Sequence, residues 1–200
     1  MLTIAIFTYK RLDLLNRCLE SLDSKYISEI LIFNDDETKT LSYKNLNKNN
    51  DLIKIFNPID FGFTNRQFRK PIYLNKAVEL CQNNLILFSD DDGIFDKGAI
   101  DSHFDALQNY HFSAGGIIRN KLFKKISKSI LQGTNYAFRK DFYNSIGKYD
   151  ENFANSMGGG DVDFWYRIYQ YAQNNDVAIA FLPNAIQTVR SKSTRNKIFK

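Results

Sequence analysis

The chain has 200 residues, 44% of them hydrophobic and 14% aromatic, and its formal net charge is +5. This length and apolar content suffice to bury the core of one domain. The only two cysteines, Cys18 and Cys81, each fall on the apolar stripe of a predicted helix, which excludes a disulfide framework and a cysteine-based metal site. The basic residues match no nucleic-acid-binding motif, so no nucleic-acid partner is expected.

The first seven residues contain neither a basic leader nor a small-residue cleavage site, so a cytoplasmic location is expected. Much of the excess positive charge lies in residues 121–128 and 190–200. The second stretch could contact an anionic membrane at its inner face, although a solvated terminus is the simpler interpretation.

Short apolar runs alternate with segments of helical period, which predicts one α/β domain of Rossmann-like type over residues 1–190, followed by a basic tail at 191–200. A mostly parallel central sheet flanked by helices is expected. The predicted strands are Leu2–Thr8, Glu29–Asn34, Leu52–Phe56, Asn84–Ser89, His111–Ile118, Asn135–Arg139 and Asp176–Leu182. The predicted helices are Leu12–Leu22, Pro71–Gln82, Gly98–Asn109, Lys140–Ile146 and Asp161–Gln173.

Polar residues follow three of these strands, where open α/β sheets bind their ligands. The first strand is followed by Tyr9-Lys10-Arg11, the second by Asp35-Asp36-Glu37, and the fourth by Asp90-Asp91-Asp92-Gly93. Three adjacent carboxylates repel one another unless a cation compensates them. A divalent metal carrying a diphosphate would do so, because Mg²⁺ and Mn²⁺ bind carboxylate, phosphate and water oxygens.

The same acidic triplet has other interpretations. It could be a solvated acidic turn. It also resembles the metal-binding strand of a phosphate-loop ATPase, but no Gly-x-x-x-x-Gly-Lys-Ser/Thr sequence occurs. A calcium loop is poorly supported, since its sixth position is Phe95 instead of glycine and its twelfth is Asp101.

A second polar cluster begins with three glycines at 158–160, which deliver Asp161 and Asp163 to the start of an amphipathic helix. An aspartate in a first helical turn is often only a cap. Combined with a metal-held diphosphate, however, such a carboxylate would serve as the base that deprotonates an incoming hydroxyl. Basic residues before the second long helix could reach phosphate oxygens: Arg66, Arg69 and Lys70.

Taken in order, these motifs resemble family 2 glycosyltransferases of the GT-A fold. The resemblance covers nearly the whole chain, from about Leu2 to Arg190. It is carried by Thr8-Tyr9-x-Arg11, Asp35-Asp36, Arg69 with Asn75-Lys76-Ala77, Asp90-Asp91-Asp92, and Gly160-Asp161-x-Asp163-x-x-x-Arg167.

The resemblance implies an inverting transfer of a sugar from a nucleotide-sugar, usually a UDP-sugar, to a hydroxyl of a saccharide or lipid-linked saccharide. It implies Asp161 as the catalytic base, Asp92 and Asp90 as ligands of Mn²⁺ or Mg²⁺, and Asp163 and Trp165 at the acceptor. The expected nucleotide-sugar-binding residues are Thr8, Tyr9, Arg11, Asp35, Arg66, Arg69, Asp90 and Asp91.

Two features depart from the family pattern. No histidine follows the last predicted strand, which makes metal dependence less certain, and Arg190 or Lys192 could supply positive charge instead. Gly160 stands where relatives often have a glutamate that helps to bind the acceptor, so no acceptor contact carries over at that position.

Two rival functions share this architecture. A sugar nucleotidyltransferase would have a glycine-rich loop after the first strand, and none is present there. A non-catalytic nucleotide-sugar-binding protein stays possible, because the late histidine is missing and the chain is short. The Lys-, Asn-, Ile- and Phe-rich composition suggests a microbial enzyme of surface polysaccharide synthesis by analogy only.

Overall fold

The computed structural model describes all residues except 49, 65–67, 120–121, 125–132, 156–158 and 190–200. The strands are β1 Leu2–Thr8, β2 Ile27–Asn34, β3 Ile53–Phe56, β4 Leu85–Asp90, β5 Gly93–Phe95, β6 Phe112–Arg119, β7 Leu122–Lys124, β8 Tyr136–Arg139 and β9 Ile179–Val189. The α-helices are α1 Leu12–Glu20, α2 Lys70–Leu80, α3 Ala99–Ala106, α4 Lys140–Ile146 and α5 Gly160–Asn174. Short 3₁₀ turns lie at Tyr43–Asn45, Pro58–Phe61 and Glu151–Asn155.

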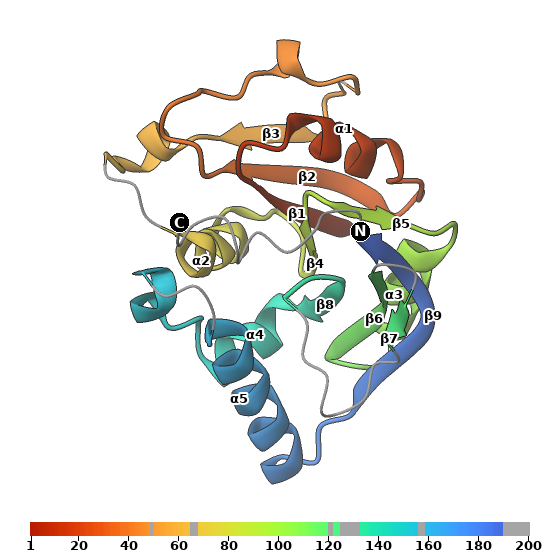
Figure 1. Ribbon diagram of the computed structural model, residues 1–200. Coiled ribbons are helices and arrows are strands. Elements are labelled where there is room, and N and C mark those ends of the chain that lie inside the picture. The colour runs from red at the N-terminus through yellow and green to blue at the C-terminus, as the bar shows by residue number, and fades with distance from the viewer. Residues whose placement is uncertain (49, 65–67, 120–121, 125–132, 156–158, 190–200) are drawn as a thin grey trace.

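The described strands form one sheet in the order β3-β2-β1-β4-β8-β6-β9-β5, with β7 paired to β6 (Figure 1). β3, β2, β1 and β4 run parallel to one another. β8 is antiparallel to both β4 and β6, whereas β9 is parallel to β6. The carboxyl ends of β1, β2 and β4 therefore lie together at one edge of the sheet.

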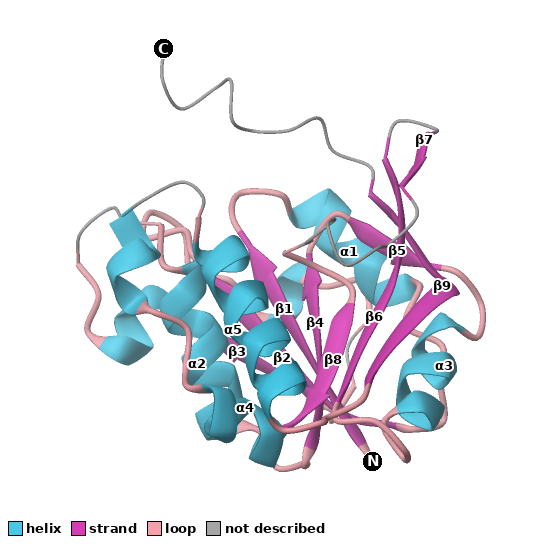
Figure 2. Cartoon of the chain, turned by 90° about the horizontal axis from the view of Figure 1, so that it is seen from below, coloured by secondary structure: helices cyan, strands magenta, loops and turns pink. Residues whose placement is uncertain are grey.

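Helices cover both faces of this sheet, as the alternation of side chains along buried strands requires. In β1, Leu2, Ile4 and Ile6 pack with the apolar stripes of α1 and α3. Ala5 and Phe7 face the opposite side, which α2, α4 and α5 cover. Figure 2 shows these two helical layers on either side of the strands.

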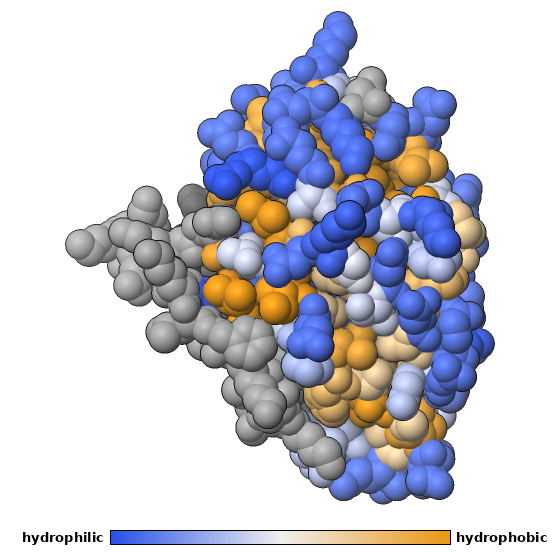
Figure 3. Space-filling model, turned by 90° about the vertical axis from the view of Figure 1, so that its right-hand side faces the viewer, coloured by the Kyte–Doolittle hydropathy of each residue, from blue (hydrophilic) through white to orange (hydrophobic). Residues whose placement is uncertain are grey.

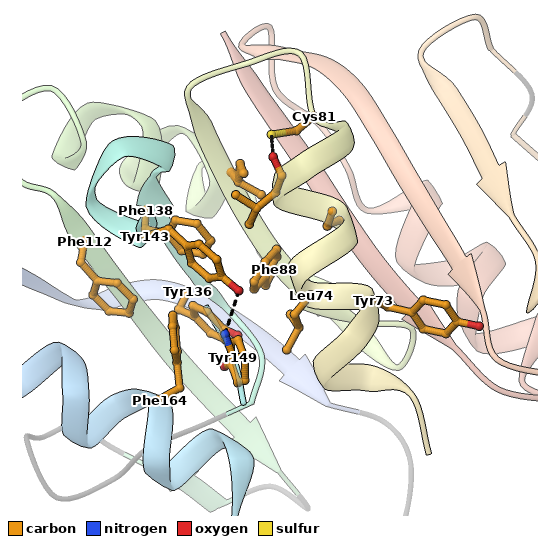
Figure 4. Close-up of a cluster of buried hydrophobic side chains, with 14 of the residues drawn as sticks. Tyr73, Leu74, Cys81, Phe88, Phe112, Tyr136, Phe138, Tyr143, Tyr149 and Phe164 are labelled. Carbon is orange, nitrogen blue, oxygen red and sulfur yellow. Dashed lines mark hydrogen bonds between the residues drawn. The ribbon is translucent and has the colours of Figure 1, made fainter. Parts of the chain in front are cut away.

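The layer between the sheet and α2, α4 and α5 is rich in aromatic residues (Figure 4). Phe88 meets Tyr136 and Phe138 edge to face, at 5.3 and 5.0 Å between ring centroids. Buried tyrosine hydroxyls need partners, and here Tyr136 and Tyr149 bond each other at 2.7 Å. This layer supports the chain segment that leads to α5.

On the face shown in Figure 3, apolar residues gather in the middle and polar residues surround them at the top, the right edge and the bottom. The most exposed of the large apolar side chains include Ile59, Tyr166 and Val162. Within the described part of the chain, no helix combines the length and apolar character needed to cross a membrane.

The predicted fold class is confirmed: one α/β sheet lies between helical layers. The predicted ranges of β1 and α4 are reproduced, and the other predicted helices and strands are found with shifted ends. Two short strands, β5 and β7, were not predicted, because three residues are too few to show a period of two. The last strand extends to Val189, seven residues beyond the predicted end, because it pairs with both β6 and β5.

Candidate functional site

Three of the predicted polar clusters meet at the carboxyl edge of the parallel strands. Thr8 pairs in register with Asn34 of β2, and Phe7 pairs with Asp90 of β4. The backbone N–H of Asp35 donates to the Thr8 carbonyl at 2.8 Å, and the N–H of Asp91 donates to the Phe7 carbonyl at 3.1 Å. The strand order thus brings together residues that are far apart in the sequence.

Arg11 joins the end of β1 to the acidic turn after β4. Its guanidinium lies 2.5 Å from Asp91 Oδ1 and 3.2 Å from Asp92 Oδ2, so one fork holds two neighbouring carboxylates. Asp91 is fully buried. Burial raises its pKa to about 7, although Arg11 and a hydrogen bond with Thr8 act in the opposite direction.

Lys70, the first residue of α2, binds Asp90, the first carboxylate of the acidic turn. Its Nζ donates to Asp90 Oδ1 at 2.6 Å and to the Gly133 carbonyl at 2.7 Å. Burial lowers the pKa of Lys70, but the negative charges of Asp90, Asp161 and Asp92 outweigh it and raise that pKa overall. Lys70 is therefore a fixed cation at neutral pH.

Asp161 lies at the start of α5, next to this lysine. A β-carbon on Gly133 would collide with the Asp161 carboxylate, so the two residues are in direct contact. Because the Gly133 carbonyl binds Lys70, the aspartate after the glycine run and the acidic turn after β4 face the same point. This is the juxtaposition that the sequence motifs led us to expect.

Asp35 binds a different basic residue, Arg69. The Arg69 guanidinium is 2.8 Å from Asp35 Oδ1, and its backbone N–H donates to Oδ2 at 3.2 Å. Burial raises the pKa of Asp35, while Arg69 lowers it. Arg69 is completely buried beside the Phe63 ring and holds the second-strand aspartate, and its predicted contact with a phosphate stays a prediction.

Tyr9 and Arg66 are the remaining residues predicted to bind the nucleotide-sugar. Tyr9 lies beside the β1 end, with the Lys10 ammonium 5.0 Å from its ring centroid. Lys10 adopts a left-handed backbone conformation, at φ 56°, and approaches Asp36 at 3.7 Å. Arg66, like Arg190 and Lys192, lies outside the described residues.

The two predicted acceptor residues, Asp163 and Trp165, contact α5 and the aromatic core. Asp163 pairs with Arg167 one turn along α5, at 2.8 Å. Trp165 packs edge to face on Phe112 in the core, and it also lines an apolar surface pocket with Val162. Their acceptor roles stay predictions.

The sequence analysis did not identify the residues that hold nearby backbone segments in place by hydrogen bonds. The backbone N–H of Asp90 donates to Thr134 Oγ1, which in turn donates to Gln187 Oε1 at 2.8 Å. Asn75 Nδ2 donates to the Tyr149 carbonyl at 3.1 Å, and its Oδ1 accepts from the Tyr149 N–H at 3.0 Å. The position of Asn75 on an otherwise apolar stripe of its helix was the one feature of the sequence that could have indicated its contact with Tyr149.

The two cysteines are buried, as expected from their places on apolar helix stripes, and the two histidines contact neighbouring side chains. His103 is buried between Ser113 and Asn135, at 2.8 and 3.0 Å. His111 is exposed beside the Phe142 ring. Cys18 and Cys81 are buried free thiols.

The donor chemistry of the site fits Mn²⁺ or Mg²⁺, since carboxylate oxygens are their usual protein ligands. Four carboxylates, Asp90, Asp91, Asp92 and Asp161, also outnumber the two cations Arg11 and Lys70. However, each carboxylate of the turn is ion-paired, and the described residues contain no group of three acidic, histidine or cysteine side chains placed to hold an ion. A divalent ion would thus have to open one of these ion pairs.

Comparisons with known proteins place this geometry in a family. The family model described as glycosyl transferase family 2 matches residues 3–158. No curated protein matches the chain.

Solved structures share the fold at low identity. TarS 1–349 from S. aureus, in complex with UDP-GlcNAc, superimposes with a TM-score of 0.71 at 15% identity, over 100% of this chain and 61% of that one. The mannosyltransferase PcManGT from Pyrobaculum calidifontis, in complex with GDP-Man and Mn²⁺, gives 0.67 at 14% identity, over 97% and 57%. The chain thus spans about three fifths of the length of these structures.

Proposed function

The chain belongs to glycosyl transferase family 2, and from this premise we propose that it transfers a sugar from a nucleotide-sugar, a UDP-sugar in the first instance, to a hydroxyl acceptor. The observation that carries the proposal is the contact of Asp161 with Gly133, beside the Lys70–Asp90 ion pair. The contact supports the proposal because it brings a carboxylate that is able to accept a proton next to Lys70, while Arg11 binds the same acidic turn.

We propose a single displacement with inversion. The acceptor oxygen forms a bond to the anomeric carbon as the bond from that carbon to the diphosphate oxygen breaks, and the acceptor proton passes to Asp161. Lys70 and Arg11 stabilise the negative charge that develops on the departing diphosphate.

The nucleoside is proposed to bind at Thr8, Tyr9 and Asp35. Thr8 and Asp35 are tied to each other by a backbone hydrogen bond. Arg69 holds the Asp35 carboxylate in place. The remaining lone pairs of that carboxylate would accept hydrogen bonds from the N–H groups of a nucleobase. The neighbouring structures contain UDP-GlcNAc in one case and GDP-Man in the other, so a test must include both bases.

A divalent ion remains part of the proposal. Asp90 and Asp92 would hold Mn²⁺ or Mg²⁺ when their ion pairs open, and the ion would add positive charge for the departing diphosphate. The neighbour with GDP-Man also contains Mn²⁺.

The wider role is proposed by analogy. A hexose as the transferred sugar, a saccharide or lipid-linked saccharide as acceptor, and a part in polysaccharide or glycoconjugate synthesis are the expected specifics. The division into a catalytic domain at 1–190 and a basic tail at 191–200, the cytoplasmic location and the tail's contact with anionic membranes stay predictions as well. The tail lies outside the described residues.

The first experiment is a thermal-shift panel of UDP-, GDP- and dTDP-sugars, each with Mn²⁺ and with EDTA. A ligand that binds only the folded state raises the melting temperature. The best donor is then incubated without acceptor, and slow release of nucleoside diphosphate is measured. Binding without any release or transfer would favour a non-catalytic nucleotide-sugar-binding protein.

The second experiment tests the base. Asp161→Asn keeps the shape of the side chain but cannot take a proton, so the turnover number should fall roughly 100-fold to 10,000-fold while donor affinity changes little. Asp105→Asn, on the exposed side of α3 across the sheet, is the matched control and should behave as the wild type. Normal turnover in Asp161→Asn would refute the assignment.

A further inference from the structure

Lys70 lies between the acidic turn after β4 and the start of α5. Its ammonium makes one charged contact, to Asp90, and one to the backbone carbonyl of Gly133. Because that glycine also touches the Asp161 carboxylate, the lysine lies between two acids from elements that are 71 residues apart in sequence.

Lys70 is a mostly buried residue of the site and not an exposed surface charge. Its side chain is only 15% exposed, whereas Lys76, on the same helix, is 38% exposed and pairs with Glu79 on the surface. The Lys70 ammonium also lies over the Phe7 ring, with Nζ 5.9 Å from the ring centroid. Apolar and charged contacts together fix the ammonium at one position.

The other carboxylates of the turn are held separately. Arg11 pairs with Asp91 and Asp92, and Lys70 is the ion-pair partner of Asp90 among the described residues. A divalent ion that approaches Asp90 must therefore either displace the ammonium or bind beside a fixed positive charge. Both are unfavourable, because like charges at close range repel.

We propose that Lys70 competes with the divalent ion for Asp90, so that the lysine holds this position in the protein alone and the metal binds at its expense. The inference rests on the metal site of the proposed function, but it concerns metal binding alone. Sugar transfer and this competition can fail separately, because the test contains neither nucleotide nor sugar.

The test measures Mn²⁺ binding by the full chain, from the free Mn²⁺ signal in electron paramagnetic resonance. Lys70→Met keeps an unbranched side chain of similar length and removes the charge. Arg11 is then the one cation among the described residues that pairs with the acidic turn, so we expect Mn²⁺ to bind at least tenfold more tightly than in the wild type. Lys76→Met, which removes an exposed charge from the same helix, should stay within about twofold of the wild type.

Two further variants keep the test decisive. Lys70→Arg retains the charge and should leave Mn²⁺ affinity near the wild-type value, and Lys70→Gln serves if the methionine variant does not fold. In the Lys70→Met background, Asp90→Asn should abolish the gain. Equal Mn²⁺ affinity in wild type and Lys70→Met or Lys70→Gln, an equal gain in Lys76→Met, or no Mn²⁺ binding by any variant would each overturn the proposal.

Discussion

Buried charges at this site are each matched by a specific partner. Arg69 is fully buried and pairs with Asp35, while its Nε and Nη2 have no hydrogen-bond partner among the described residues. Burying such a cation is costly unless a carboxylate accompanies it. The Asp35 carboxylate thus offsets the cost of burying Arg69.

His103 gives a prediction at the level of one residue. Burial lowers the pKa of its imidazole to about 4, although the hydrogen bond with Asn135 acts in the opposite direction. The His103 imidazole therefore becomes protonated near pH 6.5 in the unfolded chain, but only near pH 4 in the folded protein. The His103 contribution to stability is fully present above pH 6.5 and is lost as the pH falls toward 4, by about 3 kcal/mol.

The measurement is the NMR signal of the imidazole between pH 7.5 and 4, with urea unfolding at the same pH values. The His103 signal should stay that of a neutral ring at pH 5. His111, which is exposed and the only other histidine, supplies the reference signal. A His103 ring that is protonated at pH 6 would contradict the buried position.

At the level of elements, α4 and α5 are joined by Arg167. Its Nη1 donates to the carbonyls of Ile146 and Gly147 at the end of α4, at 3.1 and 2.9 Å, and its other nitrogens bind Asp163. The last carbonyls of a helix need such donors. Arg167 thus fixes the helix that carries Asp161 against its neighbour.

We predict that Arg167→Met lowers the free energy of unfolding by about 1–3 kcal/mol, because two helix-end carbonyls lose a charged donor. Asp163→Asn should cost less, since Arg167 keeps its carbonyl contacts. Urea unfolding measures both variants. If Asp163→Asn instead raised the KM for the acceptor with unchanged stability, the predicted acceptor role of Asp163 would gain support over this structural one.

At the level of the whole molecule, one continuous sheet connects every described strand. The two apolar layers share that sheet, so neither can lose its packing without exposing the other. Such a structure should unfold in one cooperative step.

Trp165 is the only tryptophan and lies in the core between α5 and the sheet, on Phe112 and Tyr136. Its fluorescence reports the tertiary packing of one layer, whereas far-ultraviolet circular dichroism reports all helices. The two urea unfolding curves should coincide. Separate midpoints would show that α5 and its aromatic layer unfold independently of the rest.

The sequence by itself determined the fold class, the strand and helix positions and the acidic and glycine-rich segments. These follow from local patterns: apolar residues at a period of two or 3.6, and turn residues between them. For the same reason Asp35, the acidic turn and Asp161 could be selected as site residues.

Only the tertiary structure decided which cation binds which acid. Arg11 pairs with Asp91 and Asp92, Arg69 with Asp35, and Lys70 with Asp90, and the sequence analysis predicted none of these pairs. These partners lie between 20 and 81 residues apart, and they meet because parallel strands end at a common edge under α2. An ion pair depends on distances of a few ångströms between such segments, and no local period in a sequence encodes those distances.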